Sequence, residues 1–148
     1  MSTCLSKKVA SAIQQTISGV NVLRRFLPGY PPLRRMKAID LTSGNELARN
    51  LKLADTLFSR VKGLIGRQVL PIGEGLLISP CKGVHTFLMR FPIDVVFLDK
   101  NNHVIKVVEN LKPYRITQVQ ISSRRVLELP AGTAQTSKTY VGHEVAFD

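Results

Sequence analysis

The segment CKGVHTFLMRFPIDVVFLDK, residues 81–100, decides the fold that the sequence predicts. Residues 93–98 form an apolar run interrupted only by Asp94, which is typical of a buried strand. The polar residues 99–102 follow, and β-branched residues return over 103–109, so a β-hairpin is predicted here. Residues 85–90 predict one more strand, which ends at the break formed by Phe91 and Pro92.

Short strands continue on both sides of this segment. Residues 37–42 and 46–55 flank a Ser-Gly-Asn turn and predict a second hairpin. The composition of residues 46–55 also suits a helix, but the partial alternation of leucine and alanine favours a strand. Further strands are predicted at residues 76–79, 125–129 and 141–147.

One short α-helix is predicted over residues 56–65. Asp55 and Thr56 suit its N-terminal cap, and apolar side chains recur along one helical face from Leu57 to Ile65 before Gly66 ends it. About eight short strands with one helix predict a mainly β fold. We therefore expect a single-domain sandwich or barrel, jelly-roll-like in character.

Composition divides the chain into two regions. Of the 21 basic residues, seven lie in residues 1–38, which contain no acid. Residues 1–36 therefore form a basic extension, and residues 37–148 form the β domain. The extension suits an amphipathic helix at a membrane surface, a disordered tail, or a stretch that precedes the true start of translation at Met36.

The remaining composition limits the class of protein. No apolar run approaches the roughly 20 residues that cross a bilayer. Two cysteines far apart in the sequence, Cys4 and Cys81, indicate free thiols and a reducing, cytoplasmic location, with peripheral membrane association as the alternative. The absence of tryptophan and an aromatic content of only 6% argue against a nucleic-acid partner.

The predicted strand at residues 85–90 supplies several candidate site residues. Alternation places His85 and Met89 on one face and Arg90 on the other, so His85 is expected at the rim of the core. Cys81 and His85 suggest a thiolate–imidazole pair, yet four extended residues separate them by about 13 Å. Only a tight turn between them would bring the two side chains together.

Two acids stand in apolar sequence that reads as buried. Asp94 and Glu128 each lie inside a predicted strand, and buried carboxylates are nearly always partnered. The available partners are arginines, namely Arg60, Arg90, Arg115, Arg124 and Arg125. The two interpretations are structural ion pairs and a polar pocket at a strand end.

The sequence predicts no metal and no cofactor. Cys81, His85 and Met89 are soft ligands, but the paired spacings of metal sites are missing. Phosphate-binding glycine loops and the G-x-S-x-G motif are also missing.

Three segments together resemble a widespread prokaryotic family of uncharacterised proteins, domain of unknown function 192. They are residues 60–67 with 75–78, residues 84–100 with Met89 and Asp94, and VLELPAG at residues 126–132. The resemblance covers about residues 37–147 and implies a compact, mainly β domain without an assigned activity. The closing strand of the family usually begins Gly-Asp, whereas this chain has Gly142-His143.

The expected function is that of a small accessory, non-enzymatic β domain that binds a small molecule or peptide. Its candidate pocket comprises Cys81, His85, Met89, Arg90, Asp94, Glu128 and Arg60. The first alternative is a hydrolase that uses Cys81 or His85 with a carboxylate. The second is membrane or nucleic-acid association through the basic extension.

Overall fold

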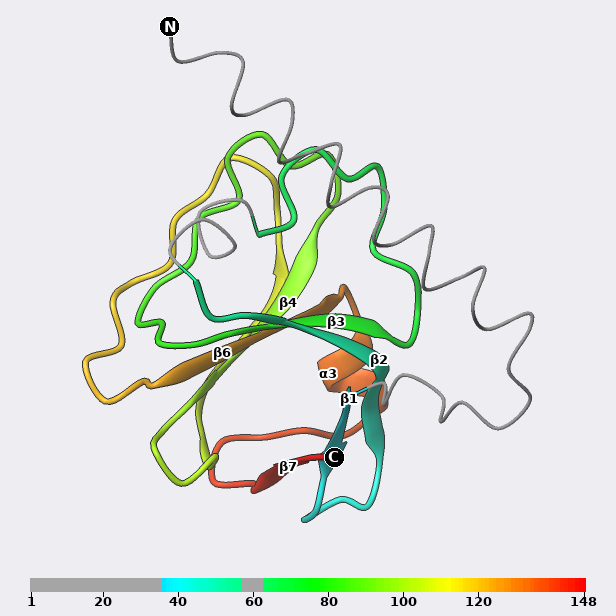
Figure 1. Ribbon diagram of the computed structural model, residues 1–148, viewed down its shortest axis with the longest axis vertical. Helices are drawn as coiled ribbons and strands as arrows, with labels where there is room; N and C mark the ends of the chain where they lie inside the picture. Colours follow the sequence, from blue (N-terminus) through cyan, green and yellow to red (C-terminus); the bar gives the residue numbers. More distant parts are fainter. Residues whose placement is uncertain (1–35, 57–62) are drawn as a thin grey trace, which may run out of the picture. The chain divides into compact units, whose positions relative to one another are not determined.

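Seven β-strands form one sheet in the computed structural model, which describes residues 36–56 and 63–148 (Figure 1). A single turn of helix, α3, follows the sixth strand. The elements are β1 (Met36–Asp40), β2 (Glu46–Ala54), β3 (Glu74–Ile78), β4 (Ile93–Leu98), β5 (Val104–Leu111), β6 (Arg125–Pro130), α3 (Thr133–Thr136) and β7 (Val145–Phe147).

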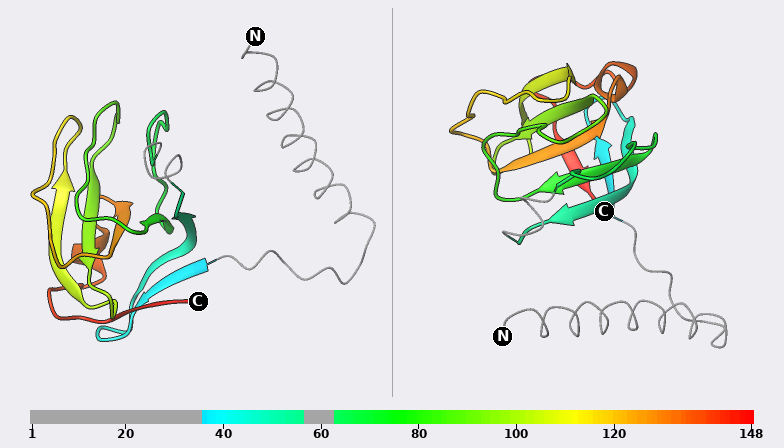
Figure 2. Two further views of the ribbon diagram at one scale, coloured as in Figure 1. Left: turned by 60° about the vertical axis from the view of Figure 1, so that its left-hand side comes forward. Right: turned by 90° about the horizontal axis from the view of Figure 1, so that it is seen from above.

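The strand order is β5-β4-β6-β3-β2-β1-β7. All neighbours are antiparallel except β2 and β3, which run parallel. A parallel pair needs a crossover connection, and residues 55–73 supply it. The sheet curls into a half-barrel, as the two views of Figure 2 show.

The two edges of the sheet meet at one end of the half-barrel. The segment before β7 pairs with the start of β5 through an isolated bridge between His103 and Glu144. The amide of Val104 donates to the carbonyl of His143 over 2.8 Å, and the amide of Val145 donates to Asn102 over 3.0 Å. The half-barrel is therefore hydrogen-bonded closed at this end.

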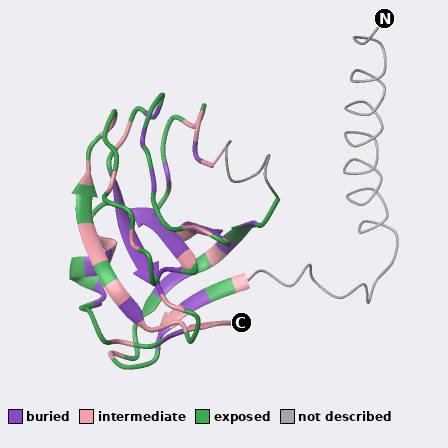
Figure 3. Ribbon diagram, turned by 90° about the vertical axis from the view of Figure 1, so that its left-hand side faces the viewer, coloured by how far each residue is buried: buried purple, intermediate pink, exposed green. Residues whose placement is uncertain are grey.

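The sheet separates two apolar clusters, because side chains alternate between its faces. Val96, Leu127 and Val145 belong to the first cluster, which gathers residues from both edges of the sheet. Val95, Val126 and Met89 belong to the second, which is covered by loop residues. In Figure 3 the central strands are buried, whereas the loops at the upper end are mostly exposed.

Most strand predictions are confirmed, including both hairpins. The predicted strand at residues 85–90 is wrong. Only His85 forms a bridge, to Ile116, because Leu88 has a φ of 61° and the amide of Met89 turns back to the carbonyl of Thr86. The last predicted strand is shortened to β7, and α3 was not predicted.

The mainly β fold is confirmed: a sandwich and a barrel were both left open, and the structure has one sheet curled into a half-barrel, with one short helix, α3, in the described part. Most of the predicted helix at residues 56–65 lies outside the described residues, since 57–62 are not among them. Residues 63–66 form turns. The basic extension, residues 1–35, also lies outside the described part.

Candidate functional site

Two long loops run side by side along one flank of the domain (Figure 1, green and yellow). We call residues 79–92 the first loop and residues 112–124 the second loop. Backbone hydrogen bonds of 2.7–3.0 Å join them, from Thr86 to Arg115, Tyr114 to Thr86, Thr117 to Val84 and Gln120 to Lys82. The hydroxyl of Thr86, which is fully buried, adds a 2.7 Å bond to the carbonyl of Lys112. The two loops therefore behave as one paired unit.

A buried serine fixes the lower end of this unit. The hydroxyl of Ser123 lies 2.9 Å from the carbonyl oxygen of Cys81, 3.4 Å from that of Leu98 and 3.0 Å from that of Arg125. One hydroxyl group thus contacts the first loop, β4 and β6 at once. Because Leu98 ends β4, this hydroxyl group holds both loops close to the turn between β4 and β5.

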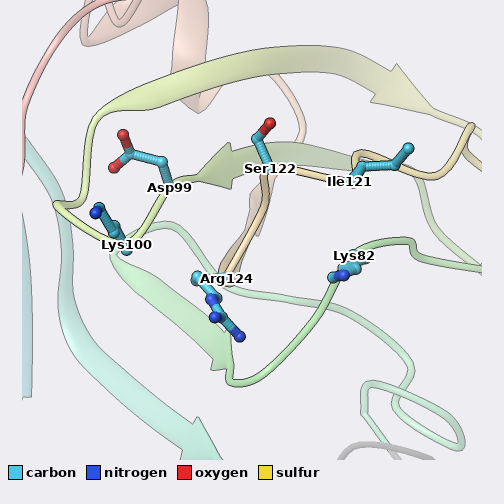
Figure 4. Close-up of a pocket in the computed structure, with 6 residues that line it drawn as sticks. All are labelled: Lys82, Asp99, Lys100, Ile121, Ser122 and Arg124. Carbon is cyan, nitrogen blue, oxygen red and sulfur yellow. The ribbon is translucent and has the colours of Figure 1, made fainter.

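A basic pocket opens between the first loop, the second loop and the turn between β4 and β5. Its volume is about 380 Å³, and it is lined by Lys82, Asp99, Lys100, Ile121, Ser122 and Arg124. Figure 4 shows the side chain of Arg124 between those of Lys100 and Lys82, with Ser122 above them. Within the described residues, no carboxylate forms an ion pair with any of the three cations.

The one acid of the basic pocket is engaged elsewhere. Partial burial raises the pKa of Asp99, but hydrogen bonds from the backbone amides of His103 and Asn101 outweigh it and leave the pKa below 3.8. These bonds are 2.9 and 2.8 Å long and belong to the turn between β4 and β5. At neutral pH the ionised Asp99 offsets one of the three cations, so the lining of the basic pocket still carries a net positive charge, and Ser122 adds a hydroxyl group.

The candidate residues from the sequence do not form one pocket. Met89 lies in the second apolar cluster, and Glu128 shares that side of the sheet because it is two residues from Val126. Asp94 alternates with Val95 and so lies on the opposite side. The sheet itself separates the two acids.

Glu128 is buried, and no residue of the described part of the chain forms a hydrogen bond to its Oε2 atom. It lies on β6 between Val95 of β4 and Leu76 of β3. Burial raises its pKa to about 8, because the charged form loses hydration without gaining a partner. This carboxyl group is neutral over most of the acidic and neutral range.

Asp94 has a structural role in the described fold. Its Oδ1 accepts a 2.8 Å hydrogen bond from the amide of Asn110, and its Oδ2 accepts a 2.9 Å bond from the amide of Ala134. The carboxylate thereby joins the end of β5 to α3. The expectation that a buried acid is partnered is met here by backbone amides rather than by an arginine.

The remaining candidates lie on or near the first loop. The thiol of Cys81 is half-buried and donates to the carbonyl of Gly83 at 3.1 Å. His85 is exposed and does not lie at the rim of the core as expected. Its ring stacks on that of Phe87, with 5.5 Å between the ring centroids. Arg90 is exposed and donates to Gln68 at 3.2 Å. Arg60 lies outside the described residues.

Sequence reasoning missed a second polar cluster. Asp40 is fully buried, and its Oδ2 lies 2.8 Å from both Thr139 Oγ1 and His143 Nδ1. The hydroxyl of Ser137 extends the cluster to Thr139 at 3.0 Å. Asp40 and His143 are 103 positions apart, so no local pattern connects them. The sequence pointed to this cluster only through His143, which departs from the family pattern.

The described residues hold neither a cluster of metal ligands nor a membrane-spanning helix. Among residues 36–56 and 63–148, no group of three or more His, Cys, Asp or Glu side chains is placed to hold a metal ion. In the same part of the chain, no helix is long and apolar enough to cross a bilayer.

The fold and the basic pocket define a class: small half-barrel domains with long paired loops. Residues 39–147 match the model of the family DUF192, described as uncharacterised, and the chain belongs to this family. A UPF0127 protein of Pyrococcus furiosus is 28% identical over 117 residues, which cover 74% of this chain and 97% of the relative. One from Pyrococcus abyssi is 37% identical over 64% of this chain and 83% of the relative.

Two solved bacterial structures share the fold. A protein of unknown function from Novosphingobium aromaticivorans has a TM-score of 0.67 and 24% identity, over 81% of this chain and 92% of its own. A putative transcription regulator from Sinorhizobium meliloti has a TM-score of 0.67 and 22% identity, over 76% of this chain and 92% of its own. The fold is therefore found in bacterial as well as archaeal relatives.

Proposed function

We propose that this domain binds a small anionic molecule in the basic pocket. The observation that carries the proposal is the convergence of Lys82, Lys100 and Arg124 on one hollow without an acid that pairs with them in the described part. Unpaired cations around a concave site attract anions and concentrate them there. The ligand would carry phosphate or carboxylate groups.

The construction of the basic pocket supports recognition rather than general attraction. Arg124 is held by its backbone, which donates to Leu98 at 2.8 Å and accepts from Cys81 at 3.0 Å. A guanidinium group offers paired donors that match phosphate or carboxylate oxygens. Ser122 adds a hydroxyl, and Ile121 adds apolar surface for the body of the ligand. Such a mixture is typical of small-molecule sites.

This site replaces the pocket expected from the sequence but keeps the class of function. From the sequence alone, a small molecule or peptide is expected to bind beside His85, Met89 and Glu128. Of the seven residues suggested then, none lines the basic pocket, although Cys81 is adjacent to Lys82. The volume of about 380 Å³ suits a small molecule better than a folded peptide.

The test is titration calorimetry on the full chain with two probes, inorganic pyrophosphate and citrate. Wild-type protein is expected to bind at least one of them, with an affinity that falls as salt is added. Arg124→Ala and Lys82→Ala should each weaken binding by about tenfold or more, which corresponds to about 1.4 kcal/mol. Preference for one probe tells phosphate from carboxylate ligands.

The matched control is Lys52→Ala, since Lys52 is exposed on β2 and does not line the basic pocket. It removes the same charge and should leave the affinity unchanged. Equal losses in Lys52→Ala and Lys82→Ala would show attraction by net charge alone. That result, or no heat with either probe, contradicts the proposal.

A further inference from the structure

Four large apolar side chains are exposed where the two loops reach the end of the domain. Phe87 and Leu88 belong to the first loop, and Tyr114 and Ile116 belong to the second. We call these four residues the apolar tip. Leu88 is 63% exposed and Ile116 is 68% exposed, so both present most of their surface to solvent. Large exposed apolar patches of this kind mark interaction surfaces.

The four residues are held together by the pairing of the loops. His85, which stacks on Phe87, is bridged to Ile116, and the amide of Tyr114 donates to the carbonyl of Thr86 at 3.0 Å. The apolar tip is thus one surface rather than four scattered residues.

Two residues of the apolar tip have a backbone conformation that is unfavourable for their residue types. Leu88 has a φ of 61° and Tyr114 a φ of 58°, the left-handed region that glycine and asparagine adopt most readily. A leucine and a tyrosine at such positions are unfavourable for the isolated fold. Their presence indicates that the exposed side chains are used.

Three cations lie close in sequence to the apolar tip. Lys112 and Arg115 flank Tyr114, and Arg90 follows Leu88; all three are exposed. Neither loop, residues 79–92 or 112–124, contains a single acidic residue. Aliphatic side chains within a ring of cations are complementary to a surface that is apolar inside and anionic outside.

We infer that the apolar tip inserts into the headgroup region of an anionic lipid bilayer. Apolar side chains enter the boundary between headgroups and acyl chains, and neighbouring Lys and Arg bind the anionic headgroups. Single-stranded nucleic acid is the competing anionic partner, since Phe87 and Tyr114 offer aromatic surface, but the two most exposed residues of the apolar tip, Leu88 and Ile116, are aliphatic. The inference rests neither on the basic extension nor on ligand binding in the basic pocket.

The chain contains no tryptophan, so a single substitution supplies a specific reporter. Ile116→Trp in the full chain should show a blue-shifted emission with vesicles of phosphatidylcholine and phosphatidylglycerol, and little change with phosphatidylcholine alone. The matched control is Leu41→Trp. Leu41 is 55% exposed but lies in the turn between β1 and β2, so its emission should not change.

Two sets of substitutions then separate binding from folding. Leu88→Asn combined with Tyr114→Asn relieves the left-handed strain, so the fold should persist while vesicle sedimentation weakens by about tenfold or more. Lys112→Gln combined with Arg115→Gln should weaken vesicle sedimentation to a similar extent. Lys37→Gln with Lys52→Gln removes equal charge from exposed sites on β1 and β2 and should not.

Three outcomes overturn the inference. The first is that vesicles sediment the protein while Ile116→Trp emission stays unchanged, which would assign membrane binding to another part of the chain. The second is that Ile116→Trp responds to single-stranded oligonucleotides and not to vesicles. The third is that wild-type protein and the Asn variant sediment equally, or that neither sediments, which would leave the apolar tip to a protein partner.

Discussion

The imidazole Nδ1 of His143 lies 2.8 Å from the Oδ2 of Asp40, which joins the segment before β7 to the end of β1. The other oxygen of Asp40 accepts the backbone amides of Thr42 and Ser43 at 2.9 and 3.0 Å. Burial raises the pKa of Asp40, but the hydrogen bonds from His143, Ser43 and Thr139 outweigh it and bring the pKa below 3.8. Because Asp40 is then ionised at neutral pH, Nδ1 of His143 carries a proton and donates.

Asp40→Asn should therefore destabilise the domain by about 1–3 kcal/mol at neutral pH, because an amide cannot accept all four donors. A carboxyl group with a lowered pKa stabilises the fold above its unfolded pKa of 3.8, and this contribution disappears as the pH falls through the folded pKa. The difference between wild type and variant should shrink below pH 3.8 in urea unfolding curves. A difference that is independent of pH would contradict this role.

Glu128 should show the opposite dependence on pH. Its pKa is about 8 in the fold and 4.5 when unfolded, so the folded state holds the proton more tightly. The stability of the wild type should fall as the pH rises from 4.5 to 8, by up to about 1.4 kcal/mol per pH unit. Glu128→Gln removes the titration and should flatten this slope in guanidinium unfolding curves. Parallel curves for the two proteins would show that Glu128 is ionised in the fold.

Asp94→Ala should cost about 2–4 kcal/mol, because the buried amides of Asn110 and Ala134 both lose their acceptor. The loss should appear first around α3, which one of these bonds holds. Hydrogen exchange of the Ala134 amide is the direct measurement. Unchanged protection of that amide would mean that α3 is held by its packing alone.

Gly75 lies where the strands leave no room for a side chain. An added Cβ would be 3.0 Å from Leu51 Cδ1 and 3.2 Å from Leu129 Cδ2. Gly75→Ala should therefore lower the midpoint of thermal unfolding, with a loss of about 1–3 kcal/mol. Gly83→Ala is the control, since its nearest neighbour would be Val119 Cγ2 at 3.8 Å. Equal effects of the two substitutions would argue against overpacking.

The strands could be predicted because their pattern is local. The run from Ile93 to Leu98 is buried along its whole length, as its apolar composition indicates. The hairpins were marked by short polar turns between apolar segments. The strand prediction for residues 85–90 is wrong, because the alternating side chains there do not lie on an extended backbone. Leu88 turns the chain, and Thr86 rather than His85 faces inward.

The sites could not be predicted, because they depend on the register and face of strands distant in the sequence. Asp94 and Glu128 look alike as acids in apolar strands. Because they lie on opposite faces of the sheet, Asp94 accepts from two backbone amides, whereas Oε2 of Glu128 has no hydrogen-bond partner among residues 36–56 and 63–148. The basic pocket brings Lys82, Lys100 and Arg124 together from three segments. The sequence offers Arg124 only as one of several possible partners for a buried acid, and nothing in the local pattern connects it with Lys82 or Lys100.

The bonds between Val104 and His143 and between Asn102 and Val145 have a dynamic consequence. They join the two edges of the sheet at one end, so amides there should exchange with solvent only when the whole domain unfolds. The paired loops are bonded to each other and are tied to the sheet through Ser123 and Arg124, so we expect the rest of their length to exchange first, by local opening. The division gives the loops freedom to adjust to what they bind while the opposite end maintains the fold.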